Sequence, residues 1–144
     1  MSVYFPHYRK DTSKGITPPN PNAEPDMIQH ITKHRGQKTP YTSVSESPEA
    51  IKHFEGVLYK TDPNTIISDN HVFISHTDLI VFLRSQSKSP DRKTKTLAAR
   101  AYQLADRARE ALVEWQFSSI FKGIAPKDQI SLCRNQIQKY FQKV

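Results

Sequence analysis

Proline is concentrated in the first third of this 144-residue chain. Seven of its ten prolines fall within the first fifty residues, and the densest run is Thr17-Pro18-Pro19-Asn20-Pro21-Asn22. Because proline fixes φ and lacks a backbone N–H, such a run forms neither a helix nor a central strand. We therefore expect a short strand within Ser2 to Tyr8, interrupted at Pro6, and then a long surface loop.

The mass of 16.6 kDa corresponds to a single domain over residues 1–144. Folding at this length buries about two-thirds of the unfolded surface, enough for one core without metals or disulfides. The single cysteine, Cys133, cannot form an internal disulfide, so a reducing environment is the default expectation. The longest nearly apolar run, Leu79 to Leu83, is far shorter than the ~20 residues that span a bilayer, and the first residues lack a signal-peptide pattern. We expect no membrane partner.

Beyond the loop, the apolar pattern predicts short mixed elements, typical of an α+β fold. The expected strands are Tyr41–Ser45, Val57–Lys60 and Val72–Ile74, and the expected helices are Met27–His34, Glu49–Phe54, Thr77–Leu83 and Thr96–Arg109. Residues 110–117 alternate in polarity, which favours a strand, although Leu112 and Trp115 also continue a helical spacing. Ile130–Tyr140 is a terminal element that the pattern assigns to neither helix nor strand. The basic stretch Ser85 to Thr96 is expected to be a loop or lid.

Positive charge is concentrated in one segment. The formal charge is +7, and residues 84–109 hold eight Lys and Arg against Asp91 and Asp106, a net of +6. Such a segment attracts polyanions by releasing their counterions, in a salt-dependent way. The alternative is an ordinary solvated loop and helix face. The eight cations are Arg84, Lys88, Arg92, Lys93, Lys95, Arg100, Arg107 and Arg109.

Common catalytic motifs are absent from the sequence. It has no glycine-rich phosphate loop and no HExxH, GxSxG or CxxC pattern. Four glycines in the whole chain are too few for a Walker or dinucleotide-binding fingerprint together with the other turns. Most large enzyme classes are excluded on these grounds.

Three short motifs follow one another along the chain. They are Tyr8-Arg9, then Tyr41-Thr42-Ser43-Val44-Ser45 with Ser47-Pro48-Glu49-Ala50, then Glu110 or Glu114 followed by Gly123-Ile124-Ala125-Pro126. In this order they resemble the mono-ADP-ribosyltransferase toxins of the cholera and pertussis type. Members of that family show an Arg on the first strand, an aromatic-x-Ser-Thr-Ser strand before a helix, and a Glu on a late strand before a Gly-Ile-Pro turn. Val44 stands where these relatives have the central Thr.

The resemblance implies an α+β fold in which two small, mostly antiparallel sheets pack around an NAD cleft with flanking helices. It also implies a toxin effector domain that transfers ADP-ribose from its co-substrate NAD to a macromolecular acceptor. The basic segment favours a nucleic acid acceptor, especially RNA, slightly over protein. The expected acceptor contacts are Arg84, Lys88, Arg92, Lys93 and Lys95.

The resemblance assigns each site residue a role. Cleavage of the nicotinamide–ribose bond passes through an oxocarbenium-like transition state, which the carboxylate of Glu110 or Glu114 would stabilise. Arg9 would hold the phosphates of NAD, because a planar guanidinium suits an anion. Ser43 would fix the rotamer of the glutamate, with Ser45 bracing the strand. The remaining cofactor-binding candidates are His30, with His34 as its alternative, and Tyr41.

Each of these residues also has an ordinary structural interpretation. Arg9 is then a surface residue, and Ser43 and Ser45 are exposed strand residues. Glu110 and Glu114 are a solvated pair on a helix face, and the histidines at positions 30 and 34 form a surface pair rather than metal ligands. The resemblance therefore depends on the joint order of the three motifs.

The resemblance also suggests a biological setting. The chain would be the cargo of a larger secreted toxin, acting in the cytoplasm of a target cell, with an immunity protein as partner in the producer. Two other functions stay open. One is a non-catalytic, basic nucleic-acid-binding module formed by residues 84–109, and the other is a nuclease that uses His30 or His34 with a Glu as acid and base.

Overall fold

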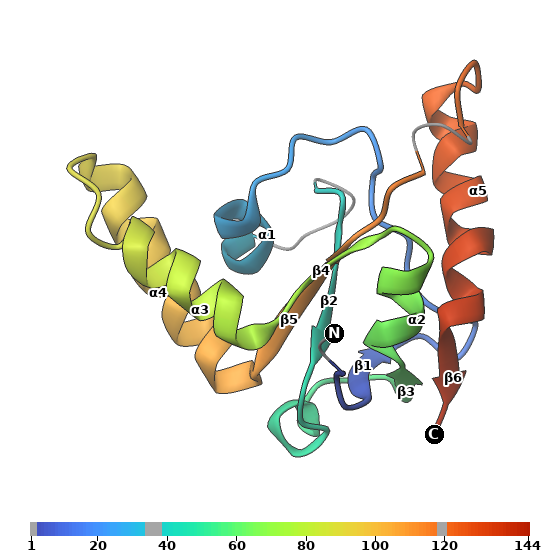
Figure 1. Ribbon diagram of the computed structural model, residues 1–144, viewed down its shortest axis with the longest axis horizontal. Coiled ribbons are helices and arrows are strands. Elements are labelled where there is room, and N and C mark those ends of the chain that lie inside the picture. Colours follow the sequence, from blue (N-terminus) through green and yellow to red (C-terminus); the bar gives the residue numbers. More distant parts are fainter. Residues whose placement is uncertain (1–2, 34–38, 118–120) are drawn as a thin grey trace.

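A computed structural model describes residues 3–33, 39–117 and 121–144. Within these ranges the chain is α+β, as expected, and forms one open six-stranded antiparallel sheet in the order β4-β5-β2-β1-β3-β6 (Figure 1). The strands are β1 His7–Asp11, β2 Tyr41–Ser45, β3 Val57–Thr61, β4 Val72–Ile74, β5 Glu110–Glu114 and β6 Phe141–Lys143. Of the expected strands, β2 and β4 are confirmed at both ends, and β3 is one residue longer.

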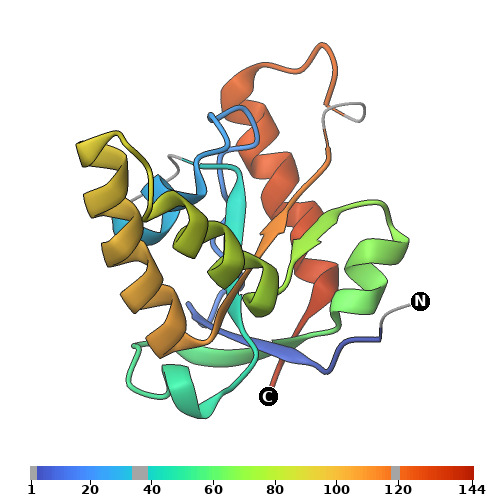
Figure 2. The same cartoon turned by 60° about the vertical axis from the view of Figure 1, so that its left-hand side comes forward.

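The sheet changes direction at its centre. Neighbouring strands pair through three to five residues everywhere except between β1 and β2, where the single registered pair is Tyr8 with Ser45. One half of the sheet is therefore β4-β5-β2 and the other is β1-β3-β6, and Figure 2 shows their strands running in different directions. Two separate sheets are not found among the described residues, because this one pair joins the halves.

Helices cover both faces of the β4-β5-β2 half (Figure 1). The α-helices of the described residues are α1 Met27–Lys33, α2 Pro63–Ser68, α3 His76–Gln86, α4 Arg92–Ala108 and α5 Pro126–Ile137, and 3-10 turns span Glu49–Ile51 and Gln138–Tyr140. Successive side chains of β5 point alternately into two hydrophobic cores. Leu112 is buried with Ile31 of α1 and Leu83 of α3, whereas Val113 is buried with Ile137 of α5. This period of two is the pattern that favoured a strand at this position.

One expectation for the α3–α4 region is wrong. The segment from Ser85 to Thr96 is mostly helical instead of a loop, since α3 continues to Gln86 and α4 begins at Arg92. Asp91 explains the early start of α4, because its side chain accepts a hydrogen bond from the Thr94 backbone N–H at 3.0 Å. An N-cap of this kind satisfies one of the free donors of the first helical turn.

Residues after α4 form a strand, not a continued helix. Arg109 has a left-handed φ of 52° and ends α4, so that β5 begins at the next residue. Three other boundaries differ from expectation: the first strand is His7–Asp11 and follows Pro6, Glu49–Phe54 is reduced to a 3-10 turn, and Asp62 caps helix α2 where only a turn was expected. The terminal element whose type the sequence left undecided is helix α5, with Pro126 in its first turn.

Two further expectations concern His34 and membrane-spanning helices. The His34 assignment lies outside the described residues. No helix in the three described ranges is long and apolar enough to cross a membrane.

Candidate functional site

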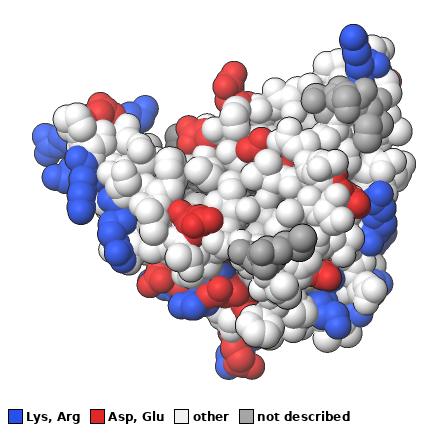
Figure 3. Space-filling model, viewed as in Figure 1, with Lys and Arg blue, Asp and Glu red and all other residues white. Residues whose placement is uncertain are grey.

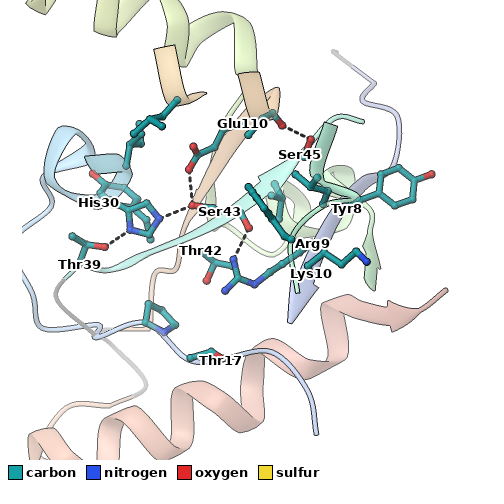
Figure 4. Close-up of a pocket in the computed structure, with 18 of the residues that line it drawn as sticks. Tyr8, Arg9, Lys10, Thr17, His30, Thr39, Thr42, Ser43, Ser45 and Glu110 are labelled. Carbon is teal, nitrogen blue, oxygen red and sulfur yellow. Dashed lines mark hydrogen bonds between the residues drawn. The ribbon is translucent and has the colours of Figure 1, made fainter. Parts of the chain in front are cut away.

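A cavity of about 560 Å³ lies where the two halves of the sheet meet the end of α4. Its lining includes Arg9 of β1, His30 of α1, Ser43 of β2, Arg107 of α4 and Glu110 of β5. In Figure 4 the side chains of His30, Ser43 and Glu110 point toward one another, and Arg9 reaches the same strand from the other side. The structure thus brings together one residue from each of the three sequence motifs.

Glu110 is the buried carboxylate of this cavity. It is the first residue of β5 and is 8% exposed. The Ser43 hydroxyl donates a hydrogen bond to Glu110 Oε2 at 2.6 Å. Burial raises the pKa of Glu110 to about 7, and the hydrogen bond from Ser43 and the charge of Arg9 oppose that rise. At neutral pH the side chain therefore titrates between an acid and a carboxylate.

The backbone of Glu110 is hydrogen bonded as well as its side chain. His76, the first residue of α3, donates from Nδ1 to the Glu110 carbonyl at 2.8 Å, and its Nε2 lies 3.5 Å from Asp106 Oδ1. His76 is buried. Sequence reasoning missed this residue, because no local signal links a histidine at the start of one helix to a strand 34 residues later.

A chain of polar groups continues from Glu110 through Ser43 to His30. His30 Nε2 lies 2.6 Å from Ser43 Oγ, and His30 Nδ1 is hydrogen bonded to Thr39 Oγ1. Because the Ser43 hydroxyl gives its proton to Glu110, its oxygen accepts from His30 Nε2–H, which leaves Nδ1 to accept from Thr39. Thr39 was also missed, since it lies outside the recognised motif.

Arg9 is fixed by two hydrogen bonds. Its Nε donates to Asp11 Oδ2 at 2.8 Å, and its Nη1 donates to the Ser43 carbonyl at 2.8 Å. A guanidinium has five N–H donors, so three have no partner among the described residues. The Asp11 carboxylate also accepts from Thr17 Oγ1 at 2.7 Å. Burial raises the pKa of Asp11, but Arg9 and Thr17 outweigh it and hold that pKa below its usual value.

Asp11 is a partner that sequence reasoning missed but had the means to find. It lies two residues after Arg9, and residues two apart on a strand point to the same face. An Arg and an Asp at this spacing predict an ion pair along the strand. The pair orients the guanidinium toward the cavity and limits its freedom before any ligand binds.

Glu114 is not part of the cavity. It ends β5, four residues and about 13 Å of strand beyond Glu110. Its carboxylate accepts from Gln116 Nε2 at 2.8 Å and lies beside Tyr41. The structure therefore distinguishes between the two glutamates that the sequence left open, and it places Glu110 in the cavity.

Tyr41 and Ser45 lie at opposite ends of β2. The Tyr41 ring lines the cavity and meets the His30 ring edge to face, with centroids 5.7 Å apart. Burial, followed by the nearby Glu114, raises the pKa of Tyr41 to about 12. The Ser45 hydroxyl donates to the Ala108 carbonyl at 2.6 Å, so it braces the end of α4 rather than offering its proton to a cofactor.

The expected acceptor contacts lie away from the cavity. Arg84 donates to the Tyr102 hydroxyl at 2.9 Å, and its guanidinium stands 5.5 Å from the centre of that ring. The other four occupy the turn between α3 and α4 or the first turn of α4: Lys88, Arg92, Lys93 and Lys95. None of the five lines the cavity within the described part of the chain, whereas Arg107 at the other end of α4 does.

The candidate site has no group of three metal-ligating side chains among residues 3–33, 39–117 and 121–144. The polar groups of the cavity are instead linked to one another by hydrogen bonds. No family model, no curated protein and no solved structure matches this chain.

Proposed function

We propose that this chain is an NAD-dependent mono-ADP-ribosyltransferase, the effector domain of a toxin, which transfers ADP-ribose from NAD to a macromolecular acceptor. One observation carries the proposal: Arg9, Ser43 and Glu110 come from three separated motifs and converge on one cavity, with Ser43 hydrogen bonded to Glu110. The cavity volume of about 560 Å³ is within the range typical of small-molecule sites.

Glu110 supplies the charge that the reaction needs. The bond between ribose C1′ and the nicotinamide nitrogen breaks, and nicotinamide leaves as a neutral molecule with the bonding electron pair. The ribose then carries oxocarbenium character, which an adjacent carboxylate stabilises. An oxygen or nitrogen of the acceptor bonds to C1′ and gives its proton to the Glu110 carboxylate, which returns it to water.

Arg9 and Ser43 prepare the cavity for this step. The three Arg9 N–H groups that have no partner among the described residues suit the pyrophosphate of NAD. Ser43 acts as a positioning residue, because its hydroxyl fixes the Glu110 carboxylate and its own oxygen is fixed by His30. A preorganised carboxylate does not have to reorient as charge develops.

The order of the polar groups argues against a serine hydrolase. A nucleophilic serine donates its proton to a histidine that is itself oriented by a carboxylate. Here Ser43 lies between the histidine and the carboxylate, and the far nitrogen of His30 meets the hydroxyl of Thr39. This order supports a serine that orients Glu110.

The pH dependence of NAD cleavage tests the proposal. We expect the purified protein to release nicotinamide from NAD with a kcat/KM that rises with pH and levels off above an apparent pKa of about 7, because Glu110 must be a carboxylate. The measurement is chromatography of nicotinamide over a pH series, with folding checked by circular dichroism. A folded protein that releases no nicotinamide at any pH, with or without a cell lysate as acceptor, would refute the proposal.

Removing the Ser43 hydroxyl should change both the rate and its pH profile. In Ser43→Ala we expect kcat to fall about tenfold with a small change in KM, which corresponds to the net free energy of one positioning hydrogen bond. The apparent pKa should move upward, because the hydrogen bond from Ser43 lowers the pKa of Glu110. Ser43→Thr keeps the hydroxyl and should restore the wild-type profile. An unchanged profile in Ser43→Ala would contradict the positioning role.

A further inference from the structure

Helix α4 carries a straight row of cations along one exposed side. Lys93, Arg100 and Arg107 follow one another at intervals of seven residues, and all three are exposed. Seven residues turn an α-helix through about 700°, within 20° of two full turns, so the three lie nearly in line and about 10.5 Å apart. Figure 3 shows Lys and Arg gathered along the outer edge of the α3–α4 hairpin.

This row, which we call the α4 row, is not neutralised by neighbouring acids. Among the residues that the structure describes, none of its three members takes part in an ion pair. Asp91 instead caps α4 through Thr94, and Asp106 faces His76. Three fixed positive charges therefore face solvent along a length of about 21 Å.

The α4 row ends at the cavity. Arg107 lines it, close in sequence to Glu110, and so does Phe54, which follows the 3-10 turn Glu49–Ile51. Phe54 is 45% exposed, and its ring meets that of His53 edge to face with centroids 4.5 Å apart. The cavity at the end of the row thus has both an exposed aromatic ring and a cation, the two kinds of group with which proteins stack the bases and neutralise the phosphates of a single strand.

From these observations we infer that the acceptor is a single-stranded nucleic acid, whose phosphates lie along the α4 row and whose modified nucleotide enters the cavity between Arg107 and Phe54. The inference rests on the proposed transferase function and names its substrate class. A single strand is favoured because its bases are already unpaired, whereas a base inside a duplex must first be flipped out of the stack at an energetic cost. The nucleophile is an oxygen or nitrogen of that nucleotide. It bonds to ribose C1′ of NAD as nicotinamide leaves, and it gives its proton to the Glu110 carboxylate.

The test compares two double variants of equal charge in the full chain. Lys93→Gln/Arg100→Gln removes two charges from the α4 row, and Lys122→Gln/Lys127→Gln removes two exposed charges at the start of the α5 region. Neither Lys93 nor Arg100 lines the cavity. Gln has a helix propensity similar to that of Lys and Arg, which suits the three helical positions, and Lys122 is an exposed turn residue. The probes are fluorescent single-stranded RNA and single-stranded DNA of the same sequence, and a duplex.

Two quantities are measured with these proteins. Affinity is followed by fluorescence anisotropy without NAD, between about 50 and 200 mM salt. The wild type should bind single strands with a steep salt dependence, and loss of two phosphate contacts in the α4-row variant should reduce the slope by about 1.4. Transfer is followed with labelled NAD, and it should fall by roughly tenfold in that variant at the higher salt. The control variant should match the wild type in both.

The outcomes separate the acceptor class from the transferase function. Label on RNA alone or on DNA alone identifies the source of the strand and supports the inference. NAD cleavage without oligonucleotide binding, or with label on protein instead, overturns the inference and leaves the transferase proposal standing. Equal losses in the α4-row and control variants overturn the role of the row. A folded protein that binds single strands but never cleaves NAD overturns the proposed function, and the acceptor role with it.

Discussion

Glu110→Gln is expected to lower NAD cleavage by roughly 10²- to 10³-fold, the cost of removing one group that stabilises developing charge. Gln preserves the size of the side chain and an oxygen that accepts from Ser43, so the change removes charge and little else. Glu114→Gln is the matched control. Its carboxylate lies outside the cavity, and we expect its cleavage rate to stay within about twofold of wild type. The cleavage rate of each variant is measured as nicotinamide release at saturating NAD.

The comparison of the two glutamates is informative in either direction. Loss of cleavage in Glu114→Gln together with full activity in Glu110→Gln would contradict the site as described. Equal losses in both, with a lower free energy of unfolding in both, would indicate damage to β5 rather than to catalysis. Unfolding curves of the two variants should therefore accompany the kinetics.

The same substitution should make the protein more stable at alkaline pH. Glu110 has a folded-state pKa of about 7, above its ordinary value of 4.5. A raised pKa contributes stability that is fully present below the unfolded-state value and is lost as pH rises through the folded-state value. Above about pH 8 the buried carboxylate thus costs about 3 kcal/mol, and Gln at this position escapes that cost. We expect Glu110→Gln to exceed wild type by this amount at pH 8 and to match it near pH 4.5.

Urea unfolding at the two pH values measures this difference. Other buried groups also titrate in this range: burial lowers the pKa of His7 and of His71, which makes stability rise with pH. Both proteins carry these histidines, so the difference between wild type and variant isolates Glu110. Glu114→Gln should differ from wild type by less than about 0.5 kcal/mol at both pH values. A gap that is the same at pH 4.5 and pH 8 would contradict the titration of a buried Glu110.

Elements with a regular pattern and clear ends were predictable from the sequence. Tyr41–Ser45 and Val72–Ile74 match their strands, and β5 shows the alternation that marked it. The length of α4 was not predictable from apolar periodicity, because its first turn is polar and is stabilised by the Asp91 cap. A capping residue followed by a polar turn looks like a loop when apolar spacing is the criterion.

The site was predictable in its residue types but not in its partners. On a strand, residues 110, 112 and 114 share a face, so the sequence alone does not distinguish Glu110 from Glu114. The distinction comes from tertiary structure: β2 pairs beside β5 so that Ser43 reaches Glu110, and His76 binds the Glu110 backbone from another helix. Such partners are distant in sequence, and no local pattern predicts them.

The cavity spans the narrowest junction of the sheet, where a single residue pair joins β1 to β2. Arg9 lies on one half of the sheet, and Ser43 and Glu110 lie on the other. Apart from the Tyr8–Ser45 pair, the Arg9 bond to the Ser43 carbonyl ties the halves together at this point. A ligand held by both Arg9 and Glu110 would therefore add a link between the two halves where strand pairing is sparsest, so that ligand binding would stabilise this junction.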